Sequence, residues 1–201
     1  MSPSSGRWSG TASRQSRHLA ILSAAGRIFT EVGYDRASMD LIATRTGVTK
    51  ATLYAHFHSK AHLFGAVMER WLEALPAPAF LVDPAACVRE QLTTVAGDLV
   101  RLATHPAAVA IATALAQSPR MHSIEHLHAW QQRYCPHQRH LEKVLSRHCG
   151  CDAPALAARQ FLLLVIGNLD PSTACSEPDG QMRALAAVDV FMRAFLDRDP
   201  R

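Results

Sequence analysis

The sequence predicts an all-α protein of two domains, and three observations lead to that fold class. Ala and Leu dominate the chain, β-branched runs are few, and no alternating stretch is long enough for a sheet. The run 38–60 has the pattern of two short helices joined by a glycine-containing turn. The 201 residues leave room for a second helical core after that module. We expect a disordered arm at 1–16, a three-helix helix-turn-helix domain at 17–75 and a larger helical domain at 76–201.

The N-terminal arm is expected to be disordered because residues 1–16 are rich in Ser and Gly and carry Arg7, Trp8 and Arg14. Such a basic arm either reaches a minor groove of DNA or is simply solvated, and the sequence leaves both open. Beyond the arm, apolar residues share one helical face and predict a first helix that ends near Gly33. The residues of this face are Leu19, Ile21, Leu22, Ala25, Ile28 and Phe29.

The run 38–60 begins with a residue that can cap a helix. The Ser38 hydroxyl can accept from the free backbone N–H groups of a helix that starts at Met39. Gly47 can leave that helix in a left-handed conformation without steric cost, so we expect the helix to end near Thr46. Two helices joined through such a turn place the second helix in the major groove of DNA.

The second helix of this run is expected at 50–57. Its apolar residues, Leu53 among them, must face a core, which leaves a polar and cationic surface on the other side. The first side chains of a recognition helix meet the edges of bases. We therefore place Thr49, Lys50 and Thr52 at the bases.

The order of motifs in this block is specific. Gly47-Val48 is followed by Leu53-Tyr54-Ala55-His56-Phe57 and then by Ser59-Lys60. With these motifs, the block from about Arg17 to Trp71 resembles the TetR family of transcriptional regulators, whose signature has the same elements at the same spacing. Short helical hairpins with surface lysines also occur in proteins that never bind nucleic acid. The match of the whole ordered set favours the DNA-binding interpretation.

The resemblance implies a DNA-binding role for seven side chains. It places Thr49, Lys50 and Thr52 near bases and the other four on phosphates. For Lys60 the residues themselves agree, because a cation near a helix start is disfavoured by the helix dipole and is stabilised by an external anion. Taken singly, Tyr54 also fits an edge-of-core residue with its hydroxyl in water. The expected DNA-binding residues are Ser38, Thr49, Lys50, Thr52, Tyr54, His56 and Lys60.

Charge is distributed unequally along the chain. Residues 1–75 hold 9 Lys and Arg against 5 Asp and Glu, whereas residues 76–201 hold 12 of each. A basic first third followed by a neutral remainder is typical of a phosphate-binding module joined to a regulatory one. The sequence has no N-terminal apolar segment and no run near the roughly 20 apolar residues of a membrane span. We therefore expect a cytoplasmic protein with reduced cysteines and no membrane partner.

The rest of the chain predicts six further helices. Ser59 can cap a fourth helix that runs to 71–75, and Pro76-Ala77-Pro78 then breaks the chain. Four of the next five helices begin at or beside proline, which is tolerated at the first helical position. These five helices are expected at 84–104, 106–117, 119–149, 154–169 and 180–196, with a loop at 170–179.

A homodimer is expected through the last two helices, because they carry more apolar surface than their own domain requires. One short recognition helix reads too few base pairs, whereas a twofold dimer reads two half-sites of a palindrome. The alternative is that these residues only fill the core of the monomer. The candidate interface residues are Phe161, Leu162, Val165, Val188, Phe191, Met192 and Phe195.

The resemblance also implies a small-molecule pocket among the middle helices of the second domain. By linkage, an effector that weakens DNA binding is itself bound more weakly, by the same factor, when DNA is present. We predict a ligand-responsive transcriptional regulator that an effector releases from a palindromic operator in double-stranded DNA. Repression is favoured because occupancy alone blocks polymerase. Candidate lining residues, each of which also fits a place in the core, are Leu102, Ile111, Leu115, Met121, Leu127, Trp130, Tyr134 and Leu163.

Other triggers remain open at this point. A histidine-rich stretch permits a transition-metal sensor, Cys149-Gly150-Cys151 permits a thiol switch, and a DNA-binding regulator without a ligand is a third alternative. The chain has no nucleophile elbow, no Gly-rich phosphate loop and no carboxylates paired for acid/base work, so we expect neither an enzyme nor a cofactor or bound metal. The possible metal ligands are His122, His126, His128, Cys135, His137 and His140.

Overall fold

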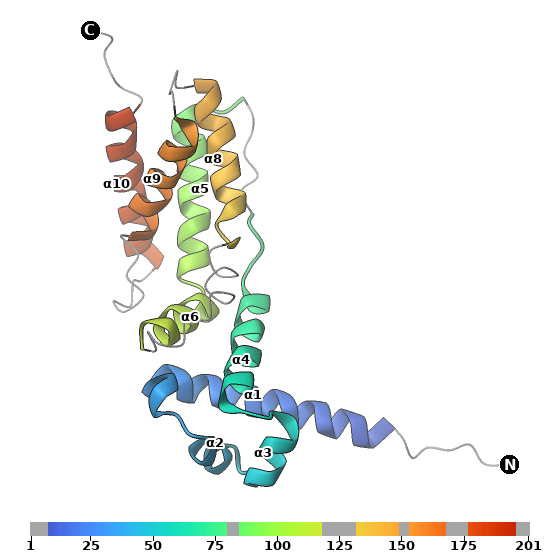
Figure 1. Ribbon diagram of the computed structural model, residues 1–201. Coiled ribbons are helices and arrows are strands. Elements are labelled where there is room, and N and C mark those ends of the chain that lie inside the picture. Colours follow the sequence, from blue (N-terminus) through green and yellow to red (C-terminus); the bar gives the residue numbers. More distant parts are fainter. Residues whose placement is uncertain (1–7, 80–84, 118–131, 149–152, 168–176, 196–201) are drawn as a thin grey trace, which may run out of the picture. The chain divides into compact units, whose positions relative to one another are not determined.

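The computed structural model describes residues 8–79, 85–117, 132–148, 153–167 and 177–195, and within these ranges it contains helices and no strand (Figure 1). The predicted all-α fold is thereby confirmed. The chain divides into two compact units: unit 1 holds Met1–Glu73 and Ala110–His126, and unit 2 holds Ala74–Val109 and Leu127–Arg201. The helices are α1 (Trp8–Arg36), α2 (Met39–Thr46), α3 (Lys50–His56), α4 (Lys60–Ala74), α5 (Val88–Ala103), α6 (Pro106–Ala116), α8 (Cys135–His148), α9 (Pro154–Gly167) and α10 (Glu177–Phe195).

Helix α1 begins earlier than the sequence suggested. It starts at Trp8, so residues 8–16 are helical rather than a disordered arm, and residues 1–7 lie outside the described part. The only proline in this region is Pro3, so no residue between 8 and 16 interrupts the helical backbone hydrogen bonds.

Gly33 breaks α1 near its end. Its φ of +78° lies in the left-handed region, which glycine enters at no steric cost. A Cβ at this position would also lie 3.2 Å from the backbone oxygen of Gln117, whose side-chain amide donates to the carbonyl of Thr30 at 3.1 Å. The contact helps to explain why Ala110–His126, which the sequence assigned to the second domain, belongs to unit 1.

Unit 1 has an aromatic and aliphatic core beneath α2 and α3. The ring of Phe64 lies edge-on to Phe29 at 5.0 Å and to Tyr34 at 5.1 Å between ring centroids. Aromatic pairs of this geometry stabilise by roughly 0.5–1.5 kcal/mol beyond their buried area. This core fixes the helices that carry the candidate DNA-binding residues. Its fully buried members include Ile21, Ile28, Phe29, Ile42, Leu53, Phe57, Leu63, Phe64 and Met68.

Unit 2 is a helical bundle in which α5 packs against α8, α9 and α10 (Figure 1). The ring of Phe191 lies edge-on to that of Phe161 at 5.1 Å and stacks on that of Phe195 at 4.6 Å, both between ring centroids. The buried members of this core include Leu92, Val95, Leu99, Leu141, Leu145, Phe161, Val165, Val188 and Phe191.

A hydrogen bond at the N-terminus of α5 determines where this helix starts. The backbone N–H of Cys87 donates to the Glu90 carboxylate at 3.2 Å, which places the start of α5 at Val88 rather than near 84.

The helix expected at 119–149 is only partly described. Residues 118–131 lie outside the description, and a turn at Arg133–Tyr134 precedes α8. Pro136 occupies the first turn of α8, where a missing N–H removes no helical hydrogen bond. Among the described residues no single helix has the length and apolar character to cross a membrane, although α5 and α6, joined at a bend of 67°, pass that test as a pair.

Candidate functional site

Helices α2 and α3 form the predicted helix-turn-helix. Gly47 ends α2 with a φ of +68°, and the backbone N–H of the next residue, Val48, donates to the carbonyl of Ala43 at 3.2 Å. A Cβ at Gly47 would meet nothing within 4 Å, so the left-handed backbone alone accounts for glycine here. The two helices are thereby linked through a turn of fixed geometry.

The first turn of α3 is held by Thr49. Its hydroxyl oxygen accepts from the backbone N–H of Thr52 at 3.1 Å and lies 2.8 Å from the Thr52 hydroxyl. Leu53 is fully buried on the opposite side and anchors the helix to the core. Thr49 therefore both caps the helix and stands at its exposed N-terminal end.

Lys50 forms an ion pair that the sequence did not indicate. Its ammonium lies 2.7 Å from a carboxylate oxygen of Asp40 on α2, and both side chains are exposed. The hydrogen bond to Asp40 raises the pKa of Lys50, and the charge of the same carboxylate adds to the effect. Lys50, the first residue of α3, is thus paired with the Asp40 carboxylate, and DNA would have to replace this anion in order to bind the lysine.

The other residues predicted for DNA on this face reach the surface to different degrees. Ser38 is exposed, and its hydroxyl accepts from the N–H of Leu41 at 3.1 Å as the cap of α2. Tyr54 keeps 41% of its surface exposed. His56 is half-buried, with its ring 5.8 Å from that of His18 on α1. That these side chains contact phosphates stays a prediction.

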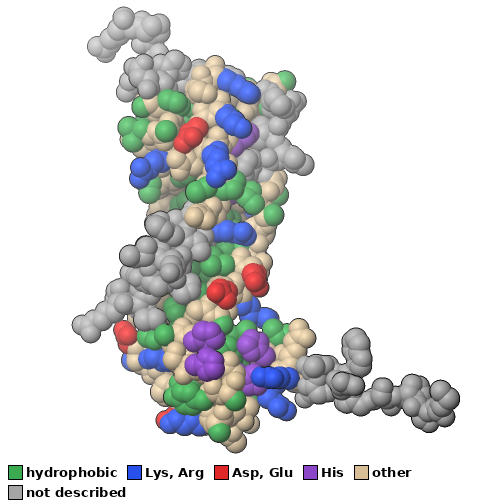
Figure 2. Space-filling model, turned by 45° about the vertical axis from the view of Figure 1, so that its right-hand side comes forward, with side chains coloured by type: hydrophobic (Ala, Val, Ile, Leu, Met, Phe, Trp, Pro, Cys, Tyr) green, Lys and Arg blue, Asp and Glu red, His purple; other side chains and the backbone are tan. Residues whose placement is uncertain are grey.

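Basic side chains collect around His18. Arg14, Gln15, His18 and His56 line, with Ala55, a surface hollow of about 390 Å³. Burial lowers the pKa of His18, and the nearby charges of His56 and Arg14 lower it further. Figure 2 shows histidine side chains gathered beside Lys and Arg side chains. Arg14 therefore supplies the positive charge of this hollow, whereas His18 is held toward its neutral form.

Lys60 has a structural role that differs from the expected phosphate contact. Its ammonium donates to the backbone carbonyls of Tyr34 at 2.9 Å, Ala37 at 3.0 Å and Asp35 at 3.5 Å. It also lies 4.2 Å from the centroid of the Tyr34 ring, a cation–π distance. An ammonium has three donors, and three carbonyls take them, two in the last turn of α1 and one just after it. The helix-dipole argument identified the need for a partner correctly, but the partner is internal.

Unit 2 contains a pocket between α8 and α9, which we call the α8–α9 pocket. Its cavity volume is about 550 Å³, within the range of small-molecule sites. Two predicted ligand residues, Tyr134 and Leu163, line it, and burial raises the pKa of Tyr134 to about 12. One cation, Arg159, is among the lining residues. The lining is Gln132, Tyr134, Cys135, Gln138, Arg159, Leu162, Leu163 and Ile166.

The other residues predicted for the ligand do not line this pocket. Leu102 and Ile111 are buried in the packing of their helices, as is Leu115. For these three the alternative of a core position fits the structure, because each apolar side chain is almost completely removed from solvent. Met121, Leu127 and Trp130 lie outside the described residues.

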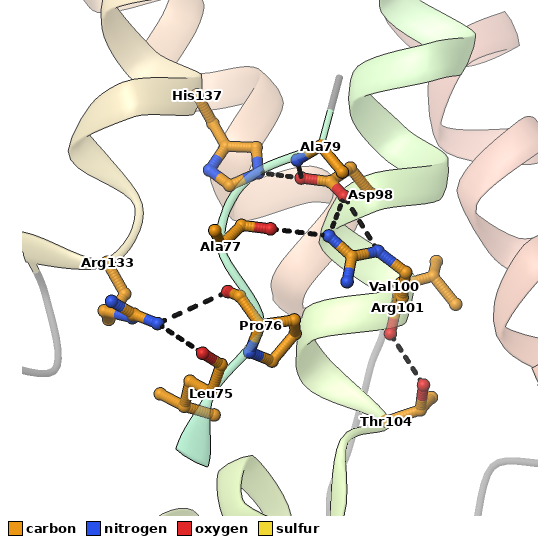
Figure 3. A network of polar contacts seen from close by, with 10 residues as sticks. All are labelled: Leu75, Pro76, Ala77, Ala79, Asp98, Val100, Arg101, Thr104, Arg133 and His137. Carbon is orange, nitrogen blue, oxygen red and sulfur yellow. Dashed lines mark hydrogen bonds and ion pairs between the residues drawn. The ribbon is translucent and has the colours of Figure 1, made fainter. Parts of the chain in front are cut away.

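A polar network holds the linker that follows α4, defined here as residues 75–79. Arg133 donates to the carbonyls of Leu75 at 2.8 Å and Pro76 at 3.3 Å, and Arg101 donates to the carbonyl of Ala77 at 2.8 Å. Figure 3 shows the linker running between the arginine from the α8 side and the arginine of α5. The backbone of the linker is therefore fixed by side chains from two other segments of unit 2.

Asp98 on α5 is the buried centre of this network. It accepts from the backbone N–H of Ala79 at 3.2 Å, from Arg101, and shares a 2.8 Å hydrogen bond with His137. Burial alone would raise the pKa of Asp98, but the hydrogen bonds from Arg101, His137 and Ala79 together hold it below its usual value. Burial lowers the pKa of His137 despite the opposing hydrogen bond with Asp98. The pair is thus an ionised carboxylate bonded to a histidine that is held toward its neutral form.

The residues predicted for a dimer contact need correction. Phe161, Leu162, Val165, Val188 and Phe191 are buried within unit 2, and Met192 and Phe195 are half-buried against the same core. In the monomer these side chains face the core of unit 2, so they offer little surface to a partner. The large apolar side chains that α9 and α10 do expose are Leu156, Leu163, Met182, Leu185 and Val190.

The candidate metal and thiol residues are not assembled into a site in the described part of the chain. No group of three or more His, Cys, Asp or Glu side chains with metal-binding geometry occurs there. His137 is engaged by Asp98, and Cys135 is a free thiol. The positions 122, 126, 128, 149 and 151 lie outside the described residues.

Sequence reasoning missed three residues that the structure brings to these sites. Asp40 was missed because nothing in the spacing of α2 and α3 signals an ion pair with Lys50. Arg159 had a usable signal, since it is the one charged residue of the helix Pro154–Gly167. Arg133 had none, because its carbonyl partners at 75 and 76 are far away in the sequence.

The N-terminal part of the chain is similar in sequence to known transcriptional regulators. A family model described as "Bacterial regulatory proteins, tetR family" matches residues 21–67, which include α2 and α3. The HTH-type transcriptional activator FasR of Mycolicibacterium smegmatis is 45% identical over 62 residues, 31% of this chain and 28% of that protein. The regulator TtgR of Pseudomonas putida is 34% identical over 92 residues, 43% of this chain and 44% of that protein. The chain thus matches less than half the length of these curated relatives.

Solved structures extend the similarity beyond the first unit. The structure called Flavonoid-responsive Regulator FrrA matches with a TM-score of 0.61 and 28% identity, covering 92% of this chain and all of that one. An alignment of that extent includes helices of unit 2 as well as those of unit 1. The similarity is therefore one of the whole fold.

Proposed function

The chain belongs to the TetR family of transcriptional regulators, and from this premise we propose that it binds a palindromic operator as a homodimer and is released by a small-molecule effector. TetR-family proteins are DNA-binding regulators, which confirms the prediction that the chain is not an enzyme. The observation that carries the proposal is the exposed N-terminal end of α3, with Thr49 and Lys50 held outward on a turn fixed by Gly47.

In this proposal α3 is the recognition helix, and it acts through the polar side chains at its start. Thr49, Lys50 and Thr52 are placed to meet base edges in the major groove, and Ser38 and Tyr54 lie where phosphates pass. Replacing the Asp40 carboxylate by DNA phosphates and bases leaves Lys50 with an anionic partner in both states. The ion pair therefore sets part of the free-energy difference between the free and the bound protein.

We expect Asp40→Asn to raise operator affinity about threefold and Lys50→Ala to lower it at least about tenfold, because each change acts in both half-sites. The first change frees the lysine before binding, and the second removes a contact. Selection of bound duplexes from a random pool supplies the operator, and fluorescence anisotropy at fixed salt then gives the dissociation constants.

Glu31→Gln is the matched control for the carboxylate. It removes one negative charge and opens another exposed ion pair of unit 1, between Glu31 on α1 and Arg45 on α2, that does not involve Lys50. An equal gain in affinity from Glu31→Gln and Asp40→Asn would mean that net charge alone is at work. A protein that selects no duplex at low salt would refute the DNA-binding assignment itself.

The homodimer is supported by the distribution of exposed apolar side chains. Five of the seven large hydrophobic residues that are exposed in the described part of the chain lie on α9 and α10. These two helices pack against each other, so their outer sides can form one continuous surface. A twofold contact through that surface would bring together the two recognition helices, one α3 from each protomer, that a palindrome requires.

The α8–α9 pocket supports a small-molecule effector. Its walls combine apolar side chains with two glutamines and with Arg159, which forms no ion pair within the described residues. A guanidinium at the wall of a largely apolar pocket favours an anionic group on an apolar body, such as a carboxylate or phenolate. The name Flavonoid-responsive Regulator, given to a structurally similar protein, supports an aromatic effector of this kind.

We expect 2-naphthoic acid to bind at least about fivefold more tightly than 2-naphthamide, because only the acid forms an ion pair with Arg159. Calorimetry measures the two affinities. Arg159→Leu should abolish the preference, whereas Arg147→Leu, which removes an exposed cation of α8 outside the pocket, should keep it. Equal binding of acid and amide to the unchanged protein would contradict the effector class.

Repression is the proposed outcome at the promoter. Occupancy of an operator that overlaps a promoter blocks polymerase without any further contact. The relative FasR is named an activator, but its match is confined to 31% of this chain. Among the described residues nothing favours a metal or thiol trigger over a small molecule.

A further inference from the structure

The segment 132–138, called here the coupling segment, has two functional sides. Gln132, Tyr134, Cys135 and Gln138 line the α8–α9 pocket. The side chain of Arg133 instead reaches the linker, and His137 bonds to Asp98. One short stretch of backbone thus forms a wall of the pocket and also holds the linker.

The contacts on the linker side are directional, and the longer of them lies near the distance limit of a hydrogen bond. Arg133 reaches the Leu75 carbonyl at 2.8 Å and the Pro76 carbonyl at 3.3 Å. Hydrogen bonds weaken steeply once donor and acceptor separate beyond about 3.5 Å. A shift of the coupling segment by about 1 Å would therefore break the second contact and strain the first.

The second route from the coupling segment passes through buried groups. His137 is fully buried, and Asp98 connects it at 2.8 Å to the backbone N–H of Ala79 at 3.2 Å. A buried carboxylate that loses a donor is destabilised, so it re-forms its bonds in another arrangement rather than remaining short of one. The linker is consequently sensitive to small displacements of α8 relative to α5.

We propose that the coupling segment transmits occupancy of the α8–α9 pocket to the linker, through Arg133 and through the His137–Asp98 pair. A ligand that displaces Tyr134 and Cys135 outward moves Arg133 and His137 with them, because all four belong to one stretch of backbone. The carbonyls of Leu75 and Pro76 and the N–H of Ala79 then lose their partners. The inference rests on the proposed function only for its regulatory consequence, because the linker directly follows α4 in the chain.

The proposal is tested first without DNA and without knowledge of the effector. Cys135 lines the pocket and is a free thiol, so a benzyl group attached there by benzyl methanethiosulfonate fills the pocket covalently. In a protein with the other four cysteines changed to serine, amide exchange at Ala79 is followed by NMR before and after labelling. We expect exchange at Ala79 to accelerate at least about tenfold and to return when dithiothreitol removes the label.

The matched control keeps Cys87 as the only cysteine. This thiol is exposed in unit 2, before α5, and takes the same label outside the pocket. Exchange at Ala79 should not change there. Unchanged exchange after complete labelling of Cys135, verified by mass spectrometry, would overturn the proposal. A Cys135 thiol that does not react would also contradict it, because the proposal starts from an open pocket.

The second arm measures the consequence for DNA. Labelling Cys135 should weaken operator binding at least about fivefold, the lower end of typical allosteric coupling. Arg133→Met, a change at a half-buried position outside the pocket, should reduce this effect to less than about twofold while the label still attaches. A label effect that persists in full in Arg133→Met would overturn the route through Arg133. If no operator is found, the proposed function fails, but the exchange result still decides whether pocket and linker are coupled.

Discussion

Lys60→Met should destabilise unit 1 by about 2–3 kcal/mol, the largest loss we expect from a single surface-proximal change. The substitution keeps an unbranched apolar stem of the same length but removes the ammonium that three carbonyls share. The carbonyls of Tyr34 and Ala37, which Lys60 reaches at 2.9 and 3.0 Å, would lose a charged donor. The cation–π interaction with Tyr34, worth roughly 0.5–1 kcal/mol, would disappear with it.

Urea denaturation followed by the methyl NMR signals of Leu53 and Leu63 measures this loss within unit 1. Lys60→Arg is the matched control, because it retains the charge and some of the donors and should restore part of the stability. A change in unfolding free energy below about 0.5 kcal/mol would show that the three hydrogen bonds contribute little.

The same variant separates the structural role of Lys60 from a phosphate contact. Each phosphate that a protein neutralises contributes about 0.9 to the slope of log affinity against log salt, so a dimer that neutralises two fewer would show a slope smaller by about 2. Because the ammonium is occupied within the protein, we expect the slope of Lys60→Met to stay the same at a temperature where unit 1 is folded. A slope reduced by about 2 would restore the phosphate assignment.

The helix-turn-helix could be predicted in detail because its determinants are local. Ser38 and Thr49 cap the helices that follow them within three residues, and Gly47 has the left-handed φ that the end of α2 requires. The role of Lys60 could not be predicted, because its acceptors lie 23–26 residues away on the other side of the turn. A sequence shows that a cation needs a partner, but it does not show where the chain folds back.

The outward and inward sides of α9 could not be distinguished from its sequence. The helix is apolar almost throughout, so the period of 3.6 residues gives no clear face. In the structure Phe161 and Val165 turn inward, whereas Leu156 and Leu163 turn outward. The prediction that α9 and α10 form the dimer contact is unaffected, but the residues expected to make it are different ones.

Val190→Glu should convert the dimer into monomers and lower operator affinity at least about 100-fold. Val190 is 55% exposed on α10, on the side that the bundle core leaves open. In a twofold interface the substitution buries two carboxylates, each of which costs several kcal/mol when it is desolvated without a partner. A monomer reads one half-site, so the loss of the dimer carries over to the DNA.

Sedimentation velocity at micromolar concentration gives the oligomeric state, and anisotropy gives the operator affinity. Val190→Thr is the matched control, since it keeps the shape of valine and adds only a hydroxyl, and it should remain dimeric. The unfolding free energy of unit 2 as a monomer should change little, because Val190 contributes no buried core contact in one chain. If the Val190→Glu protein stays dimeric, the interface lies elsewhere than on the exposed side of α10. If the substitution unfolds unit 2 as well as dissociating the dimer, Val190 belongs to the core of the monomer.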